Sequence, residues 1–198
     1  MVVAARMASL RSPTVRDKRF AFITEVAAVL AGSLLMAVSA QFSVNIPFSP
    51  VPFTGQTVGV ALVVALLGTR PAVLAMAAYL TEGAAGAPVF AAHHGGAIWL
   101  LAPSAGYLWS FPLAAFVIGR LFDVGLFGTL AGRFIAVLAG SAVILVCGAA
   151  WLVPLLGGMG PAFAAGVAPF IIVDLLKTGL AAVVAPVFAR AGGRLGIR

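Results

Sequence analysis

The chain has 198 residues, of which 63% are hydrophobic and only 9% are charged. Soluble proteins carry about 25% charged residues and roughly half apolar ones, so this composition excludes a water-soluble globular protein. The net charge of +7 is a surplus that often indicates a nucleic-acid partner. Here the basic residues lie at the ends of apolar segments, without interleaved aromatic residues, so the sequence predicts a protein that contacts membrane lipid and binds no nucleic acid.

Apolar stretches follow a basic N-terminal segment. The first, 20–40, is long enough to cross a bilayer as a helix, and its length and its Glu25 favour an uncleaved helix over a signal peptide. Two short stretches follow, and Gly68 and Pro71 between them predict a turn that separates two helices. The six predicted spans are residues 20–40, 57–68, 71–81, 103–122, 134–157 and 166–189.

The distribution of basic residues decides between five spans and six. With six, the connecting segments 41–56, 82–102 and 158–165 contain no basic residue, and eleven of the twelve basic residues fall on the opposite side. Basic residues concentrate on the cytoplasmic side of membrane proteins. The sequence therefore predicts an all-α, multi-pass protein of the cell membrane with both termini cytoplasmic. We expect a six-helix transmembrane domain over 20–190, between cytoplasmic basic tails at 1–19 and 191–198.

The last apolar stretch contains Asp174 and Lys177, whose spacing puts both side chains on one helix face. Charges inside a membrane are costly and indicate a functional site. The ammonium group suits an anionic ligand group, and the carboxylate accepts N–H bonds from a polar one. A mutual ion pair that only stabilises helix packing is the alternative. From an entry at Pro169 the two groups lie about 8 and 12 Å inward, in the outer half of the membrane, which favours a ligand site.

A proline-rich segment, 47–57, lies on the same predicted side. Its three prolines hold the backbone extended, and Gly55 permits a turn that presents Thr54 and Gln56 inward. The alternative is a rigid connector in which Thr54 or Thr57 caps the following helix.

Segment 103–107 opens the fourth predicted helix and ends in Tyr107, whose ring can stack on a ligand or hydrogen-bond to it. Phe90, Trp99, Trp109 and Trp151 can also contact a ligand, although an interfacial aromatic belt is the commoner reason for tryptophan at such positions.

Other polar residues carry less chemistry. His93 and His94 are adjacent in a Gly-rich segment and lack the spacing of metal ligands, so we expect no metal site. Glu82 is expected to be solvated at a helix end. No phosphate-binding loop precedes either lysine, and the serine and zinc hydrolase motifs are absent from the sequence. We therefore expect a protein that is not an enzyme, holds no cofactor, and needs a partner or an ion gradient for active transport.

The first helix has small residues spaced four apart, which lets another helix approach closely in lipid. This spacing serves either packing within the protein or docking of a membrane partner. The residues are Ala27, Ala28, Ala31 and Gly32.

Four segments together resemble the BioY family, the biotin-specific substrate-binding (S) components of energy-coupling factor (ECF) transporters. They are Pro-Val-Pro-Phe-Thr-Gly-Gln-Thr at 50–57, Tyr-Leu-Thr-Glu-Gly-Ala-Ala-Gly-Ala-Pro-Val-Phe-Ala at 79–91, Pro-Ser-Ala-Gly-Tyr at 103–107 and Asp-Leu-Leu-Lys at 174–177. The resemblance implies the six-helix S-component fold and uptake of biotin from outside. It also implies partners, namely a transmembrane coupling protein and cytoplasmic ABC-type ATPases, with docking through the small residues of the first helix.

The resemblance also implies roles for individual residues. Lys177 matches a lysine near the biotin carboxylate and Asp174 an aspartate near the ureido head. Phe53, Thr54, Gly55 and Gln56 match the loop that closes over the vitamin, and Tyr107 matches a tyrosine of the fourth helix.

Three positions depart from the family pattern: Glu82 replaces an apolar residue, Ser104-Ala105 replace Thr-Gly, and His93-His94 replace glycines. An S component for another small carboxylated vitamin or precursor is the first alternative function. A second, from another class, is an intramembrane enzyme or scaffold.

Overall fold

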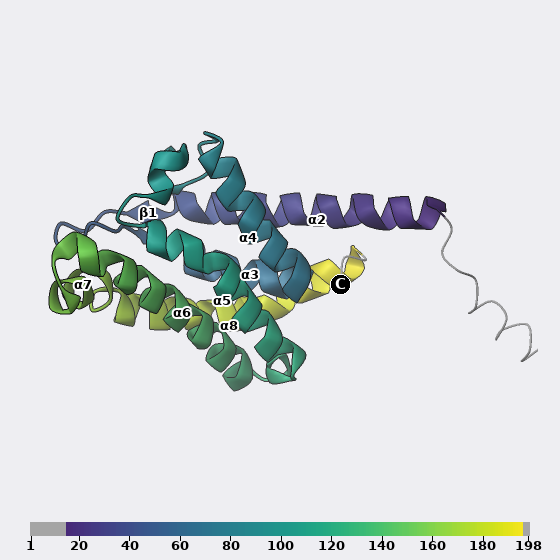
Figure 1. Cartoon of the computed structure of the whole chain (residues 1–198). Coiled ribbons are helices and arrows are strands. Elements are labelled where there is room, and N and C mark those ends of the chain that lie inside the picture. The colour runs from purple at the N-terminus through teal and green to yellow at the C-terminus, as the bar shows by residue number, and fades with distance from the viewer. Residues whose placement is uncertain (1–14, 196–198) are drawn as a thin grey trace, which may run out of the picture.

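Residues 15–195 are described by a computed structural model, and they form a bundle of α-helices (Figure 1). The helices are α2 (Val15–Gln41), α3 (Gln56–Leu67), α4 (Thr69–Ala84), α5 (Ala105–Asp123), α6 (Leu130–Leu156), α7 (Met159–Gly166) and α8 (Phe170–Arg194). The shorter elements are a hairpin of β1 (Ser43–Val44) and β2 (Phe53–Thr54), and the 3₁₀ helices η1 (Ala91–His93), η2 (Ala97–Leu100) and η3 (Leu126–Gly128).

Six of these helices coincide with the six predicted apolar stretches, and α7 is an addition to them. It lies within a segment expected to be a loop, 158–165, and its eight residues extend only about 12 Å, well short of a membrane span. In the described part of the chain, four helices are long and apolar enough to cross a membrane: α2, α5, α6 and α8. The prediction of an all-helical membrane fold is therefore confirmed, and the described residues contain seven α-helices, of which the short α7 was not predicted.

Helix ends differ from the predicted domain limits by a few residues. α2 begins at Val15, inside the predicted tail 1–19, and α8 continues to Arg194, inside the predicted tail 191–198. The rest of both tails, 1–14 and 196–198, lies outside the described residues. The turn predicted between the second and third stretches is confirmed: Gly68 has a φ of 80°, a left-handed conformation that favours glycine.

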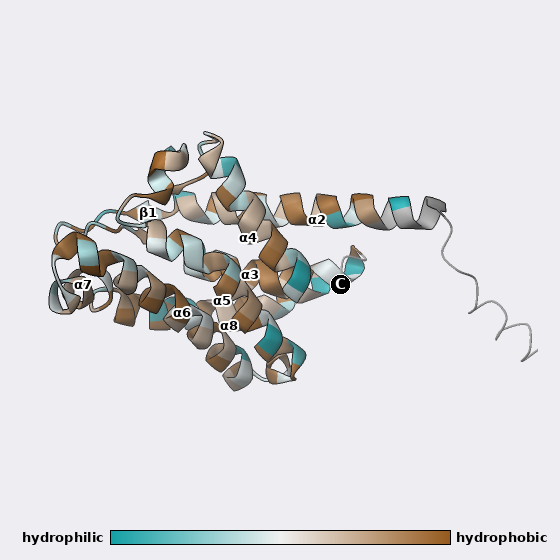
Figure 2. Ribbon diagram, viewed as in Figure 1, coloured by the Kyte–Doolittle hydropathy of each residue, from teal (hydrophilic) through white to brown (hydrophobic). Residues whose placement is uncertain are grey.

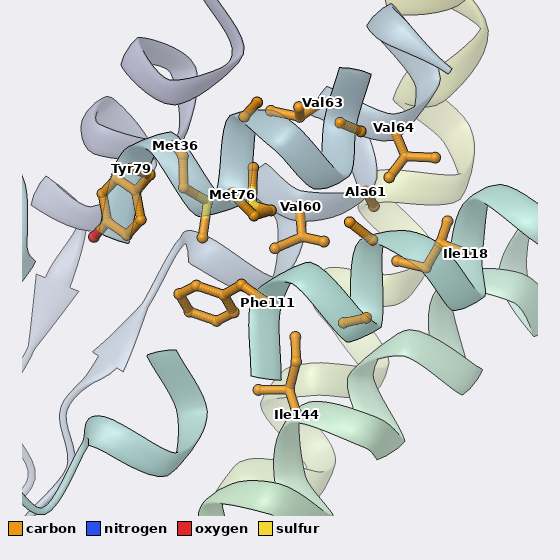
Figure 3. Packing of buried hydrophobic residues seen from close by; sticks show 14 of the residues in the cluster. Met36, Val60, Ala61, Val63, Val64, Met76, Tyr79, Phe111, Ile118 and Ile144 are labelled. Carbon is orange, nitrogen blue, oxygen red and sulfur yellow. The ribbon is translucent and has the colours of Figure 1, made fainter. Parts of the chain in front are cut away.

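α3 lies at the centre of the bundle, in contact with α2, α4, α5, α6 and α8. Eight of its twelve residues are buried, as expected for a helix that is apolar on all sides. Figure 3 shows Val60 of α3 among Met76 of α4 and Phe111 of α5, with Met36 of α2 close by. This packing leaves the ends of α3 as the places where polar groups meet.

Polar and charged residues separate between the two ends of the bundle. The start of α2, the α3–α4 turn, the α5–α6 connection and the end of α8 lie at one end, on the right in Figure 1. This end holds the described basic residues other than Lys177, and we call it the basic end. The hairpin, α7 and the connection between α4 and α5 lie at the opposite end, and apolar side chains dominate between the two (Figure 2).

A proline in α8 determines one contact between helices near the basic end. Pro186 has no N–H group, so the carbonyl of Ala182, four residues earlier, lacks its usual helical donor. Arg133 of α6 takes that place, because its Nε donates to the Ala182 oxygen at 2.7 Å. A second guanidinium nitrogen of Arg133 donates to the carbonyl of Phe127 at 2.9 Å. The side chain therefore links α6, α8 and the α5–α6 connection.

The small residues of α2 do not form a single exposed stripe. Ala28 and Gly32 are buried, and a Cβ added to Gly32 would lie 2.8 Å from Ala75 of α4. Ala27 and Ala31 are exposed. Neighbouring positions on a helix differ by about 100° in direction, so two overlapping rows of small residues face different surroundings. Packing within the protein therefore accounts for Ala28 and Gly32, and only Ala27 and Ala31 remain available to a partner.

Candidate functional site

A cavity of about 320 Å³ lies at the end of the bundle opposite the basic end. Its walls come from the first loop (residues 42–55), the second loop (residues 85–104), and parts of α3, α5, α6 and α8. This volume is typical of a site for a small molecule. The polar side chains that line it are Ser43, Asn45, Thr54, Gln56, Thr57, His94, Ser104, Tyr107, Asp174 and Lys177.

Asp174 and Lys177 lie one turn apart on α8 and both line the cavity. The Lys177 ammonium donates to the Asp174 carboxylate at 3.3 Å, and the two side chains are only 18% and 5% exposed. The ammonium group also lies 5.8 Å from the centre of the Phe53 ring, close enough for a cation–π contact. The ion pair of the alternative interpretation thus forms, and it forms in the wall of a cavity, which is where the ligand-site interpretation places both groups.

The first loop brings Thr54 and Gln56 to the cavity through the β1–β2 hairpin. The Thr54 hydroxyl donates to the Gln56 side-chain oxygen at 3.1 Å, and the Gln56 amide nitrogen donates to the Tyr79 hydroxyl at 2.8 Å. Gln56 is buried, so these bonds satisfy an amide that would otherwise be costly to bury. The two side chains are therefore held in place by the protein itself.

Two predicted residues of the first loop, Phe53 and Gly55, do not line the cavity. The Phe53 ring packs edge-on against Phe170 at 4.8 Å and lies beside the Lys177 ammonium. Gly55 has a φ of −75°, which any residue can adopt, so it is not needed to make a turn. Glycine is needed at this position because there is no room for a side chain: an added Cβ would lie 2.7 Å from the carbonyl oxygen of Ser39.

The capping interpretation of Thr57 is wrong. Gly55 occupies the cap position of α3 without a side-chain bond, and the backbone N–H of Gln56 donates to Thr54 instead. In the described part of the chain the Thr57 hydroxyl is buried and has no hydrogen-bond partner. Thr57 lines the cavity, so an unpartnered polar group lies beside the site at a position for which the sequence indicated only a capping role.

Tyr107 lines the cavity with its ring, and its hydroxyl donates to the carbonyl of Gly166 at 2.6 Å. The close approach depends on glycine, because a Cβ on Gly148 would overlap the tyrosine ring. Among the tryptophans only Trp99 lines the cavity. The indole nitrogens of Trp109 and Trp151 donate to the second-loop carbonyls of Leu100 and Ala102.

The second loop contributes Phe90, His94 and Trp99 to the cavity. The sequence indicates Phe90 and Trp99 as aromatic candidates, whereas it gives no binding signal for His94 beyond the excluded metal site. The His94 ring stacks on Trp99 with 3.8 Å between ring centres, and its Nδ1 contacts the carbonyl of Ala91 at 2.7 Å. His93 instead contacts Gln41 of α2. The adjacent histidines therefore face different partners.

Glu82 is not solvated as expected. The buried hydroxyl of Ser33 on α2 donates to the Glu82 carboxylate, which is half-buried near the end of α4. This carboxylate does not line the cavity and instead joins α2 to α4. Nearer the basic end, Glu25 and Arg70 form a second link between these helices at 3.5 Å.

Comparison with known proteins agrees with this fold. Residues 8–194 match the family model described as the BioY family. The chain belongs to the BioY family. The matched range includes the hairpin, both loops and the Asp174–Lys177 pair.

Individual BioY relatives match over most of their length. The chain is 37% identical over 161 residues to the probable biotin transporter BioY of Pyrococcus horikoshii, covering 81% of this chain and 93% of that protein. It is 39% identical over 142 residues to the biotin transporter BioY of Thermotoga maritima, covering 72% and 83%.

The fold is also similar to a crystal structure, that of the S-component for biotin from an ECF-type ABC transporter. The TM-score is 0.77 at 24% identity, with 90% of this chain and 95% of that chain covered. The architecture is therefore that of an ECF S component.

Proposed function

We propose that this protein captures biotin at the outer face of the cell membrane and delivers it inward as the S component of an ECF-type transporter. The observation that most supports this proposal is the cavity of about 320 Å³, which is lined by the Asp174–Lys177 pair in a chain of the BioY family. A small, mainly apolar cavity with a few fixed polar groups suits a vitamin with an aliphatic chain, a sulfur ring and two polar ends.

The polar groups suggest how biotin is recognised. Lys177 binds the carboxylate through a charge-assisted bond, and Asp174 accepts N–H bonds from the ureido ring. The unpartnered hydroxyl of Thr57 and the side chains of Thr54 and Gln56 supply further polar contacts, while Tyr107 and Trp99 line the apolar part. Phe53 and Gly55 support the site from behind the cavity wall.

The proposed topology has six spanning helices, α2 to α6 and α8, with both termini and the basic end in the cytoplasm. The gathering of basic residues at one end of the bundle supports it, because such residues are retained on the cytoplasmic side. The cavity then opens outward, and α7 lies at the outer surface.

Energy for accumulation must come from partners, and we propose a transmembrane coupling protein with ABC-type ATPases. The sequence contains no phosphate-binding loop of its own. The exposed residues Ala27 and Ala31 on α2 are the part of the predicted docking stripe that remains accessible to such a subunit.

Binding of labelled biotin to the purified protein tests the proposal, with thiamine, riboflavin, pantothenate and biotin amide as competitors. Biotin should compete far better than the other three vitamins. Preferential binding of pantothenate, which also carries a carboxylate, would favour the alternative of an S component for another vitamin. Recovery of chemically altered biotin after release would favour an enzyme over a transporter.

A further inference from the structure

The second loop is held in place by a side chain from outside itself, Gln41 at the end of α2. Its amide nitrogen has three carbonyls within hydrogen-bond distance for its two hydrogens: Phe90 at 3.2 Å and Val89 at 3.4 Å in the second loop, and Ala37 of its own helix at 3.1 Å. Its amide oxygen accepts from the backbone N–H of His93 at 3.1 Å and contacts the His93 Nδ1 at 2.6 Å. An amide oxygen only accepts, so the imidazole donates this bond. One glutamine therefore binds the backbone on both sides of the turn 90–93.

This turn has a conformation that needs external support. Ala92 and His93 have φ angles of 54° and 61°, a region that residues other than glycine occupy at an energetic cost. The N–H of Phe90 donates to the carbonyl of His94 at 2.9 Å, which closes the turn. The contacts with Gln41 reach the backbone before the strained pair, at Val89 and Phe90, and the N–H of His93 within it, and they oppose relaxation of the turn.

A second chain of hydrogen bonds reaches the same turn from the cavity. The Gln56 amide, in the cavity wall, donates to the Tyr79 hydroxyl on α4, and that hydroxyl donates to the Val89 carbonyl at 3.2 Å. Figure 3 shows the Tyr79 ring at the edge of the core with its oxygen turned away from the other labelled side chains. The Val89 carbonyl thus accepts from both Gln41 and Tyr79.

Movement of this turn would also move a wall of the cavity. Phe90 is buried, lines the cavity and packs edge-on against the Tyr79 ring with 5.5 Å between ring centres. A Cβ on Gly83 would overlap the Phe90 ring, so α4 leaves space for it in this position. The position of Phe90 is therefore fixed by the same two side chains that bind the backbone of the turn.

We propose that Gln41 and Tyr79 are positioning residues that hold the second loop against the cavity and thereby set the rate at which bound ligand leaves. This inference rests on the proposed function only in naming biotin as the ligand. Neither residue needs to touch the ligand, since both act through Val89 and Phe90.

The test replaces each residue with one of similar shape, as Gln41→Met and Tyr79→Phe, and measures association and dissociation of labelled biotin separately. We expect each variant to release biotin about tenfold faster, because hydrogen bonds that hold the loop are lost, while association changes by less than about twofold. A merely structural role would instead lower the amount of competent protein and leave the dissociation rate of that protein unchanged.

Two variants serve as controls. Thr81→Val removes a hydroxyl on α4 that binds only the Ala77 carbonyl of its own helix, so release should stay at the wild-type rate. His93→Gly keeps the backbone N–H that binds Gln41, suits the positive φ and loses only the imidazole bond to the Gln41 oxygen, so release should speed up clearly less than in Gln41→Met. Release in His93→Gly as fast as in Gln41→Met would mean that the imidazole alone holds the loop, and would overturn the role assigned to the backbone contacts of the Gln41 amide.

Hydrogen exchange of the ligand-free protein provides a readout that does not depend on biotin. In Gln41→Met and Tyr79→Phe the amides of residues 89–96 should exchange faster, whereas those in the middle of α4 should not. Unchanged exchange and unchanged release would overturn the inference. A wild-type protein that binds no biotin would overturn the proposed function alone, because loop exchange would still report on the two side chains.

Discussion

The ammonium group of Lys177 contacts both the Asp174 carboxylate and the Phe53 ring, so it stabilises the protein as well as facing the cavity. Removing only the lysine leaves a buried carboxylate without its counter-charge. Breaking such a pair costs about 3–5 kcal/mol, more than the pair contributes as a whole. Loss of binding and loss of stability must therefore be measured separately at this position.

We predict that Lys177→Ala weakens biotin binding about tenfold to a hundredfold, the effect of losing a charge-assisted bond of about 1.5–3 kcal/mol. Biotin amide, which has no negative charge, should lose much less. Titration calorimetry with both ligands measures the difference. An equal loss for the acid and the amide would show that Lys177 supports the fold and does not bind the carboxylate.

The double variant Asp174→Asn, Lys177→Met is the control for stability. It removes both charges, so no unpaired carboxylate remains, and thermal unfolding should lie closer to wild type than in Lys177→Ala. Its affinity for biotin should remain low.

Residues of the site differ in how far the sequence predicts them. Asp174, Lys177 and Tyr107 stand out because a polar residue in an apolar stretch is rare, and Gln56 stands out in a proline-rich segment; the structure brings all four to one cavity. Gln41 carries no such signal, because an amide at a helix end is ordinary and its partners lie some 50 positions away in the chain. Contacts of this kind depend on tertiary structure and leave no periodic pattern in the sequence.

Helices were predictable where the chain is continuously apolar. Four long apolar stretches, and two short ones separated by the Gly68 turn, indicated six of the seven described helices, but α7 has only eight residues and gives no spanning signal. Faces of a helix were harder to predict, as α2 illustrates: the spacing of its small residues is regular, yet one row is buried and the next is exposed. Which row packs inward depends on the position of α3 and α4.

The two rows on α2 predict opposite results for neighbouring substitutions. Ala31→Trp, on the exposed row, should leave biotin binding by the isolated protein nearly unchanged but sharply lower ATP-driven uptake in vesicles with the partner subunits. Gly32→Val should disturb the isolated protein itself, because its Cβ position already lies 2.8 Å from Ala75 and Leu67. If Ala31→Trp loses binding and uptake together, its row packs against this protein and is not a docking face.

The link between α6 and α8 predicts an energetic coupling between Arg133 and Pro186. Arg133→Leu should lower the unfolding free energy by about 1.5–3 kcal/mol, the value of a hydrogen bond from a charged group. In a Pro186→Ala background the Ala182 carbonyl regains a helical donor, so the same substitution should cost clearly less. Unfolding of the four proteins in detergent gives the coupling, and additive effects would contradict the assigned role.

At the scale of the whole molecule, the basic residues gather at one end of the bundle and the cavity lies at the other, which predicts how the bundle is oriented across the membrane. The orientation could be predicted from the sequence, because the positions of basic residues are known without the fold. The cavity could not, because it depends on how both loops fold back over the helix ends. Composition could not predict that arrangement.

Cysteine labelling in a Cys147→Ala background tests which end of the bundle faces the outside of the cell. An impermeant reagent applied to intact cells should modify Ile98→Cys and Gly160→Cys, which are exposed at the cavity end, and should not modify Arg70→Cys until the membrane is opened. Detergent-solubilised protein, in which all three positions should react, is the control. Labelling of position 70 but not 160 on intact cells would invert the proposed topology.

The bond from Arg133 to the Ala182 carbonyl also restricts the order in which these positions can change during evolution. A lineage that first replaces Pro186 restores the helical donor and frees Arg133 to vary, whereas a lineage that first loses Arg133 must pass through a protein with an unpaired carbonyl. Among BioY sequences, proline at the position of residue 186 should therefore occur together with a long donor side chain at the position of residue 133. Where the position of residue 186 holds another residue, the position of residue 133 should vary freely.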